Sequence, residues 1–139
     1  GKNIMDTVDP KKRSEIMSHI RGKNTKPELL IRSLLHRSGF RFRIHRRDLP
    51  GNPDIVLPKY KTVIFVHGCF WHQHPGCKQA HQPKSNTEYW RLKLERNICR
   101  DERNVLFLKE KGWKAVIIWE CEISSFLENP STLTQRIFE

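Results

Sequence analysis

The sequence predicts a domain of the α/β or α+β class built on a single sheet. Three apolar segments, at residues 55–57, 62–66 and 113–119, have the composition of buried strands. A long helical pattern separates the second of these segments from the third. A crossover helix of this kind favours parallel pairing of the two strands that it joins, in a sheet covered by helices.

The first expected element is a basic helix over residues 10–20. Asp9 is a suitable N-cap, and Pro10 suits the first helical position. One face of this helix carries Arg13, Ile16, Met17 and Ile20. That face is short and only half apolar, and residues 21–24 follow it as a linker.

A second helix is expected from Thr25 to Gly39. Glu28 follows Thr25 with the spacing of a capping box, and glycine commonly ends a helix. The apolar face of this helix is expected to consist of Leu29, Leu30, Leu34 and Leu35. Residues 40–45 then alternate between apolar and basic side chains, which predicts a strand with one buried and one basic face.

The middle of the chain predicts a β-hairpin. Residues 50–53 contain two prolines and a glycine and form a turn before the strand at 55–57. Residues 58–61 turn the chain again, into the strand at 62–66. A segment rich in histidine and cysteine follows directly on that strand.

The C-terminal half predicts helix, strand and helix. Residues 78–86 are polar and read as a loop, and Ser85 with Glu88 suggests a capping box at the start of the long helix. Gly112 ends that helix, and the third apolar strand follows. A short terminal helix is expected at residues 132–138.

Charge points to a polyanionic partner. The 139 residues include 26 lysines and arginines against 15 acidic residues, a formal net charge of +11. Nucleic acid is the first candidate because phosphate contacts supply most of the affinity in such complexes, and charge alone does not exclude RNA. The alternative is a solvated basic surface without a partner.

The cysteines favour metal binding over disulfides. No apolar run approaches the roughly 20 residues of a membrane span, and no signal peptide is evident, so a soluble intracellular protein is expected. In that setting four cysteines argue against a disulfide framework. They are metal ligands, a reactive thiol or ordinary core residues.

A zinc site is the first reading of residues 69–77. Cys69, His74 and Cys77 have the spacing C-x4-H-x2-C, and Cys121 at the end of a neighbouring strand would supply the fourth ligand of a tetrahedral zinc. His72 could replace His74 in this set, and spacing does not decide between them. Cys99 is left over and is expected in the core. The competing interpretation is that several of these thiols are simply buried.

A catalytic site is suggested by polar residues at neighbouring strand ends. Asp54, with His67 at the end of the next strand, could hold Mg²⁺ against a phosphodiester. Histidine side chains ordinarily titrate near neutral pH, so His67 and His72 are candidates for acid–base work. Glu28 is a candidate outer carboxylate. The structural alternatives are a turn-capping aspartate, a hydrogen-bonded histidine at the sheet edge and a helix-capping glutamate.

Several motifs together resemble a known family. They run in one order along the chain: Arg13-Ser14-Glu15-Ile16-Met17, Pro50-Gly51-Asn52-Pro53-Asp54, Val63 to His67 continuing as His67-Gly68-Cys69-Phe70-Trp71-His72, the helix with Tyr89-Trp90, Asn97 and Arg100-Asp101, and Trp119-Glu120-Cys121. This set resembles the very-short-patch-repair (Vsr) DNA mismatch endonucleases. The similarity covers about residues 9–122, and the histidine-glycine-cysteine string is its most specific part.

The resemblance implies a fold and an activity. The fold is a restriction-endonuclease-like core with a mixed central sheet flanked by helices, an N-terminal helical DNA-binding arm at residues 1–22 and a zinc-bound loop, in one domain of residues 1–139. The activity is Mg²⁺-dependent nicking of DNA, 5′ to the thymine of a T·G mismatch, in the repair of deaminated 5-methylcytosine.

The resemblance also implies two metal sites. Asp54 and the backbone carbonyl of Val66 would bind magnesium, and Glu28 would contact the waters on that ion. The structural zinc would be held by Cys69, His74, Cys77 and Cys121.

Roles for the remaining catalytic residues follow from the same resemblance. His72 would activate the attacking water, and His67 would support the scissile phosphate. Asp101 would orient one of these histidines, and which one stays open.

DNA would be held by aromatic wedges and by one helix face. The implied wedges are Phe70, Trp71 and Trp90, with Met17, Ile20 and Arg13 on the N-terminal arm. Lys93 and Asn97 share a helix face with Trp90 and Asp101 and suit base-edge contacts. The alternatives are aromatic core residues and a solvated helix face.

Two other functions compete with mismatch nicking. One is a zinc-stabilised DNA-binding module without catalysis, and the other is a restriction-type nuclease acting on matched duplex. The expected partner is double-stranded DNA with a T·G mismatch, with general mismatch-repair proteins as further candidates. The expected state is a monomer in the bacterial cytoplasm, associated with the nucleoid and not with a membrane.

Overall fold

The computed structural model describes residues 25–139. Its elements, in chain order, are α2 (Lys26–Arg37), β1 (Ile55–Leu57), β2 (Thr62–His67), α3 (Thr87–Glu110), β3 (Lys114–Trp119), α4 (Ile123–Glu128) and α5 (Ser131–Phe138), with short 3-10 turns at Pro58–Tyr60, Lys78–Ala80 and Glu120–Glu122. The expected helix at residues 10–20, the arm at 1–22 and the residues Arg13, Met17 and Ile20 lie outside the described part.

A mixed sheet of three strands, counted within residues 25–139, carries the fold. β1 pairs antiparallel with β2, which confirms the predicted hairpin. β2 pairs parallel with β3, with His67 opposite Trp119, as the long crossover through α3 predicted. Two ends of parallel strands therefore meet at one edge of the sheet, where the histidine- and cysteine-rich segment begins.

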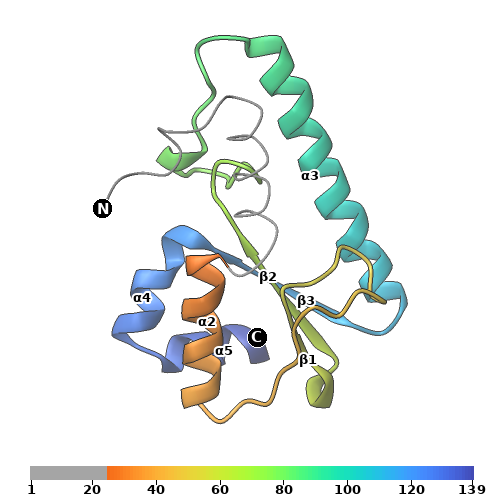
Figure 1. Ribbon diagram of the computed structural model, residues 1–139, viewed down its shortest axis with the longest axis vertical. Helices are drawn as coiled ribbons and strands as arrows, with labels where there is room; N and C mark the ends of the chain where they lie inside the picture. Colours follow the sequence, from red (N-terminus) through yellow and green to blue (C-terminus); the bar gives the residue numbers. More distant parts are fainter. Residues whose placement is uncertain (1–24) are drawn as a thin grey trace, which may run out of the picture.

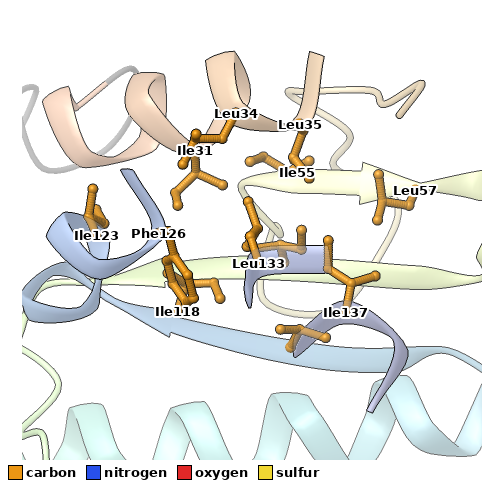
Figure 2. Close-up of a cluster of buried hydrophobic side chains, with 12 residues drawn as sticks. Ile31, Leu34, Leu35, Ile55, Leu57, Ile118, Ile123, Phe126, Leu133 and Ile137 are labelled. Carbon is orange, nitrogen blue, oxygen red and sulfur yellow. The ribbon is translucent and has the colours of Figure 1, made fainter. Parts of the chain in front are cut away.

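Helices cover both faces of this sheet. α2, α4 and α5 pack on one face and α3 on the other (Figure 1). Figure 2 shows the first core, in which buried side chains of the three helices meet buried side chains of the strands. The helix residues are Ile31, Leu34, Leu35, Ile123, Phe126, Leu133 and Ile137, and the strand residues are Ile55, Leu57 and Ile118. The second core, under α3, contains Leu49, Val56, Val63, Phe65 and Leu108.

Alternation along β2 decides which face receives the polar residues. Val63 and Phe65 belong to the core under α3, so His67, two residues further, points to the same face. Asp54 precedes β1 and shares a face with Val56 for the same reason. The sheet thus directs both side chains toward α3.

The capping box at Thr25 is confirmed, but the phase of α2 differs from the expectation. Leu29 is 48% exposed and Ile31 is fully buried, although Leu29 was expected in the apolar face. The buried stripe therefore follows Ile31, Leu34 and Leu35, with Glu28 at its N-terminal end. Neighbouring leucines on a helix point about 100° apart, so a run of them does not define its own buried side.

The strand expected at residues 40–45 does not form. The exposure alternates as predicted, but the pairing is a single antiparallel bridge between Arg43 and Val56. His45 has φ of 58°, a left-handed conformation that ends an extended segment. The segment therefore pairs with β1 at this one position and otherwise runs as a loop.

Three further expectations need correction. The box at Ser85 is absent, because α3 starts one residue later, after Asn86 in a left-handed conformation without a side-chain cap bond. Cys99 is exposed and not in the core. α4 was not expected, and it forms where Ile123 and Phe126 bury against the first core.

Within residues 25–139 no helix is both long and apolar enough to span a membrane.

Candidate active site and metal centre

A polar cavity lies between the end of β2, the turn before β1 and the inner side of α3. It encloses about 390 Å³. Its lining includes five residues singled out from the sequence: Asp54, Val66, His67, His72 and Asp101. These residues are up to 47 positions apart in the chain (54 to 101), and the sheet edge and α3 bring them together.

The backbone of β2 holds Asp54 in the lining of this cavity. Its Oδ2 accepts a hydrogen bond of 2.7 Å from the Val66 N–H. Burial raises the pKa of Asp54 to about 6, with Glu28 adding to the rise and the Val66 N–H opposing it. A half-buried carboxylate beside a second carboxylate is electrostatically suited to a bound cation.

Glu28 combines the capping role with a position near Asp54. Its side chain is buried, accepts from the backbone N–H of Thr25 at 3.3 Å and forms a 2.8 Å ion pair with Arg32. Glu28 and Asp54 also line one hollow of about 180 Å³. The two interpretations of Glu28, helix cap and outer carboxylate, are therefore compatible.

The two histidines form a stacked pair. The rings of His67 and His72 lie 3.7 Å apart and nearly parallel, at 5°. His67 is buried, and its Nδ1 has no hydrogen-bond partner among the described residues. Burial and the neighbouring His72 lower the pKa of His67 to about 4, although Asp101 opposes this effect. His67 is therefore neutral near pH 7.

Asp101 contacts His72 and not His67, a choice that the sequence left open. The distance from Asp101 Oδ2 to His72 Nδ1 is 2.6 Å. A carboxylate oxygen accepts hydrogen bonds, so Nδ1 is the donor in this contact, and in a neutral ring Nε2 is then the acceptor. A carboxylate paired with an imidazole in this way can orient the ring for acid–base chemistry.

A second cluster gathers the three cysteines and the histidine expected for zinc. The ligand atoms of Cys69, His74, Cys77 and Cys121 all lie within 4.8 Å of one another. His74 Nδ1 is 3.8 Å from Cys69 Sγ and 3.4 Å from Cys121 Sγ, and the His74 ring stacks on Trp119 at 4.2 Å. His72 belongs to the cavity instead.

These separations suit a tetrahedral ion. Zinc bound to sulfur at about 2.3 Å and to nitrogen at about 2.0 Å places the two ligand atoms about 3.5 Å apart. Burial raises the pKa of the Cys69 thiol to about 12. Such a thiol stays protonated near pH 7 unless a cation lies beside it, and a bound metal ion would supply that charge.

The aromatic residues of the loop and of α3 pack on one another outside both cores. Phe70, Trp71 and Trp90 are half-buried, with ring centroids 5.0 to 5.8 Å apart. The Lys93 ammonium lies 5.9 Å from both tryptophan rings. These contacts leave part of each aromatic surface accessible, which a core role would not.

Asn97 is engaged within the protein. Its Nδ2 donates to the Trp71 carbonyl at 3.0 Å, and its Oδ1 accepts from Arg100 at 3.0 Å. These two bonds leave the second N–H and the second Oδ1 lone pair of the amide for another partner. Arg100 also lines the cavity. It belongs to the Arg100-Asp101 motif, but no site role was predicted for it, because a single arginine in a basic helix carries no distinguishing signal.

Comparison with known proteins gives the family. Residues 5–79 match the family model described as DNA mismatch endonuclease Vsr. The type II nicking enzyme V.XorIIP of Xanthomonas oryzae is 50% identical over 121 residues, 87% of this chain and 88% of that protein. The nicking enzyme V.NmeAIP of Neisseria meningitidis is 47% identical over 122 residues, 88% and 86% of the two chains. The DNA mismatch endonuclease Vsr of Escherichia coli is 39% identical over 137 residues, 98% and 87% of the two chains. The resemblance seen in the motifs is confirmed: the chain belongs to the Vsr family of DNA mismatch endonucleases.

Proposed function

We propose that this endonuclease nicks DNA 5′ to the thymine of a T·G mismatch, on the thymine strand alone, and depends on Mg²⁺. The observation that carries the proposal is that one short segment supplies side chains to both the polar cavity and the aromatic cluster. Residues 67–72 contribute His67 and His72 to the polar cavity and Phe70 and Trp71 to the half-buried aromatic cluster. A base pair opened by the aromatics would lie beside the group that cuts.

Magnesium would be held at Asp54. The Asp54 carboxylate and the Val66 carbonyl are the proposed ligands, and Glu28 would bind the ion's waters. The fit rests on the two carboxylates that share the hollow, with the Arg32 guanidinium committed to Glu28. When bound, Mg²⁺ would lower the pKa of a coordinated water and offset charge on the phosphate.

The histidines would handle the proton and the phosphate. His72 Nε2 would accept a proton from the attacking water while Asp101 stabilises the resulting imidazolium. His67, whose neutral ring is stacked on His72, would donate a hydrogen bond to a phosphate oxygen from whichever ring nitrogen bears its proton.

A structural Zn²⁺ would bind Cys69, His74, Cys77 and Cys121. Cys69 follows β2 and Cys121 follows β3, so the ion would join the loop to the ends of both strands. This connection would fix the loop that carries the aromatics and His72. Zinc, not magnesium, is proposed here because thiolate and imidazole are its preferred ligands.

Phe70, Trp71 and Trp90 are the proposed wedges. Opening a base step costs a few kcal/mol, which stacking on inserted aromatics offsets. A T·G wobble pair stacks less firmly than a matched pair, so the same insertion would favour the mismatched site. Lys93, close to both tryptophans, would meet the DNA backbone or a guanine edge.

The proposal includes the architecture implied by the family resemblance. The parallel β2–β3 pair joined through α3, with β1 antiparallel at its side, supports a restriction-endonuclease-like core. We infer one domain over residues 1–139, acting as a monomer in the repair of deaminated 5-methylcytosine.

The test compares cutting with binding. A T·G duplex is incubated with wild type and with Asp54→Ala, each with Mg²⁺ and with EDTA, and nicks and complexes are measured in parallel. We expect nicking by wild type with Mg²⁺ only, and DNA binding by both proteins. Binding without nicking by wild type, across many flanking sequences, would support the non-catalytic module instead.

A further inference from the structure

Arg100 brings a positive charge to the lining of the polar cavity. The cavity lining also includes the carboxylates of Asp54 and Asp101, and Asp101 is committed to His72. Arg100 is exposed, and no carboxylate among residues 25–139 forms an ion pair with it. Its guanidinium is therefore available to an anion that enters the cavity.

The position of this guanidinium is defined by a single bond to its own helix. Arg100 Nη2 donates to Asn97 Oδ1 at 3.0 Å, three residues back on the same side of α3. A guanidinium has five N–H donors, so the other donors remain for a ligand. Planar donors of this kind match phosphate oxygens, the anionic groups that DNA presents along its whole length.

We propose that Arg100 binds a backbone phosphate of the nicked strand, at or next to the scissile bond. The inference rests on the proposed function, because it takes the cavity to be where the strand is cut. Arg100 then fixes the register of the strand over Asp54 and His72, as phosphate contacts commonly do.

Asn97 connects this contact to the aromatic cluster. The Asn97 amide accepts from Arg100 and donates to the Trp71 carbonyl, at 3.0 Å in each case. Only this orientation of the amide satisfies both partners, because a guanidinium only donates and a carbonyl only accepts. The guanidinium is thus placed relative to the backbone of Trp71, and Asn97 is a positioning residue.

The competing explanation is that Arg100 only adds positive charge to a basic surface. Arg103 provides the matched control. It lies one turn further along α3, is exposed and does not line the cavity, and it forms no ion pair with another residue in the range 25–139. Arg100→Gln and Arg103→Gln remove the same charge and lower non-specific attraction alike.

The experiment pairs each protein with duplexes in which one phosphate at a time is replaced by an uncharged methylphosphonate. Nicking and binding constants are measured for wild type, Arg100→Gln and Arg103→Gln on this series. Binding is included because a neutral group at the scissile position itself would stop cutting by every protein.

For wild type we expect one position near the nick at which neutralisation costs about 10- to 100-fold, the range for a hydrogen bond to a charged group. Arg100→Gln should lose a similar factor on unmodified DNA and show little further loss at that position. Arg103→Gln should show the same relative losses along the methylphosphonate series as wild type. Asn97→Ala should reduce the effect at the same phosphate and leave the others unchanged.

The proposal would be overturned if Arg100→Gln showed the same relative loss as wild type at every methylphosphonate position. The effects of the substitution and of the neutral phosphate would then be independent. The two levels of inference remain separable. Failure of wild type to nick unmodified T·G duplex refutes the proposed function, whereas wild-type nicking with multiplicative losses refutes only the role of Arg100.

Discussion

The link between Asp101 and His72 gives the sharpest prediction about catalysis. In Asp101→Asn the side chain keeps its shape but presents an amide to the ring. The amide can donate its N–H to His72 Nδ1, which would then lack a proton and leave one on Nε2. A ring protonated at Nε2 cannot accept the proton of the attacking water, so the variant disables the base without removing it.

The expected loss follows from the geometry of this contact. The 2.6 Å separation is that of a strong charge-assisted bond, and both side chains are about four-fifths buried, at 24% and 20% exposure. Loss of a general base costs about 10²- to 10⁴-fold, and the carboxylate-to-amide change behind a catalytic histidine reaches the upper end. Partial exposure lets some rings recover the active tautomer, so we expect about 10³-fold in the rate constant for nicking.

The assay is single-turnover nicking of an end-labelled T·G duplex at saturating enzyme, with binding measured separately. Glu102→Gln is the control, because it makes the same chemical change at an exposed neighbour. Binding should stay within about threefold of wild type for both variants. Nicking by Asp101→Asn at more than a tenth of the wild-type rate would show that Asp101 does not orient the base.

Three other outcomes are expected. Cys121→Ser should lose the bound zinc measured by elemental analysis, whereas Cys99→Ser keeps it; equal zinc in both would remove Cys121 from the site. Trp71→Ala should lose most of the preference for T·G over T·A duplex while retaining salt-dependent binding, and unchanged discrimination in competition assays would exclude it as a wedge. Ile118→Ala should lower the free energy of unfolding in urea by about 2–5 kcal/mol, because Ile118 is fully buried, and the 61%-exposed Leu106→Ala should change it by less than about 0.5 kcal/mol. Similar effects of these two substitutions would contradict the description of the core.

Local sequence signals predicted the elements whose boundaries depend on local chemistry. Thr25 and Glu28 both make their capping bonds. The Ser85 signal failed although its spacing is the same, because the chain enters α3 through the left-handed Asn86. The strand at 40–45 failed for a similar reason, since alternation of side chains does not reveal the positive φ of His45. Cys99 was expected in the core but is exposed, because a position in the middle of a helix does not reveal which face of that helix is buried.

The site residues that lie on one short segment were predictable from the sequence. The contacts that α3 makes with that segment were less predictable. The C-x4-H-x2-C spacing anticipated that Cys69, His74 and Cys77 would converge, and the parallel strands explain why Cys121 joins them. The separation of His72 from His74 depends on Asp101, 29 residues from His72, which leaves no local signal. Arg100 and the internal bonds of Asn97 likewise depend on how α3 lies against the loop.

Mismatch and strand specificity are tested most directly on one oligonucleotide sequence. Its T·G, T·A and C·G versions are labelled differently on the two strands and incubated with wild type and Mg²⁺. We predict a single product from the T·G duplex, cut 5′ to the thymine, with the guanine strand intact and both matched duplexes uncut. Cutting of both strands, or equal cutting of matched duplex, would contradict the account and favour a restriction-type nuclease.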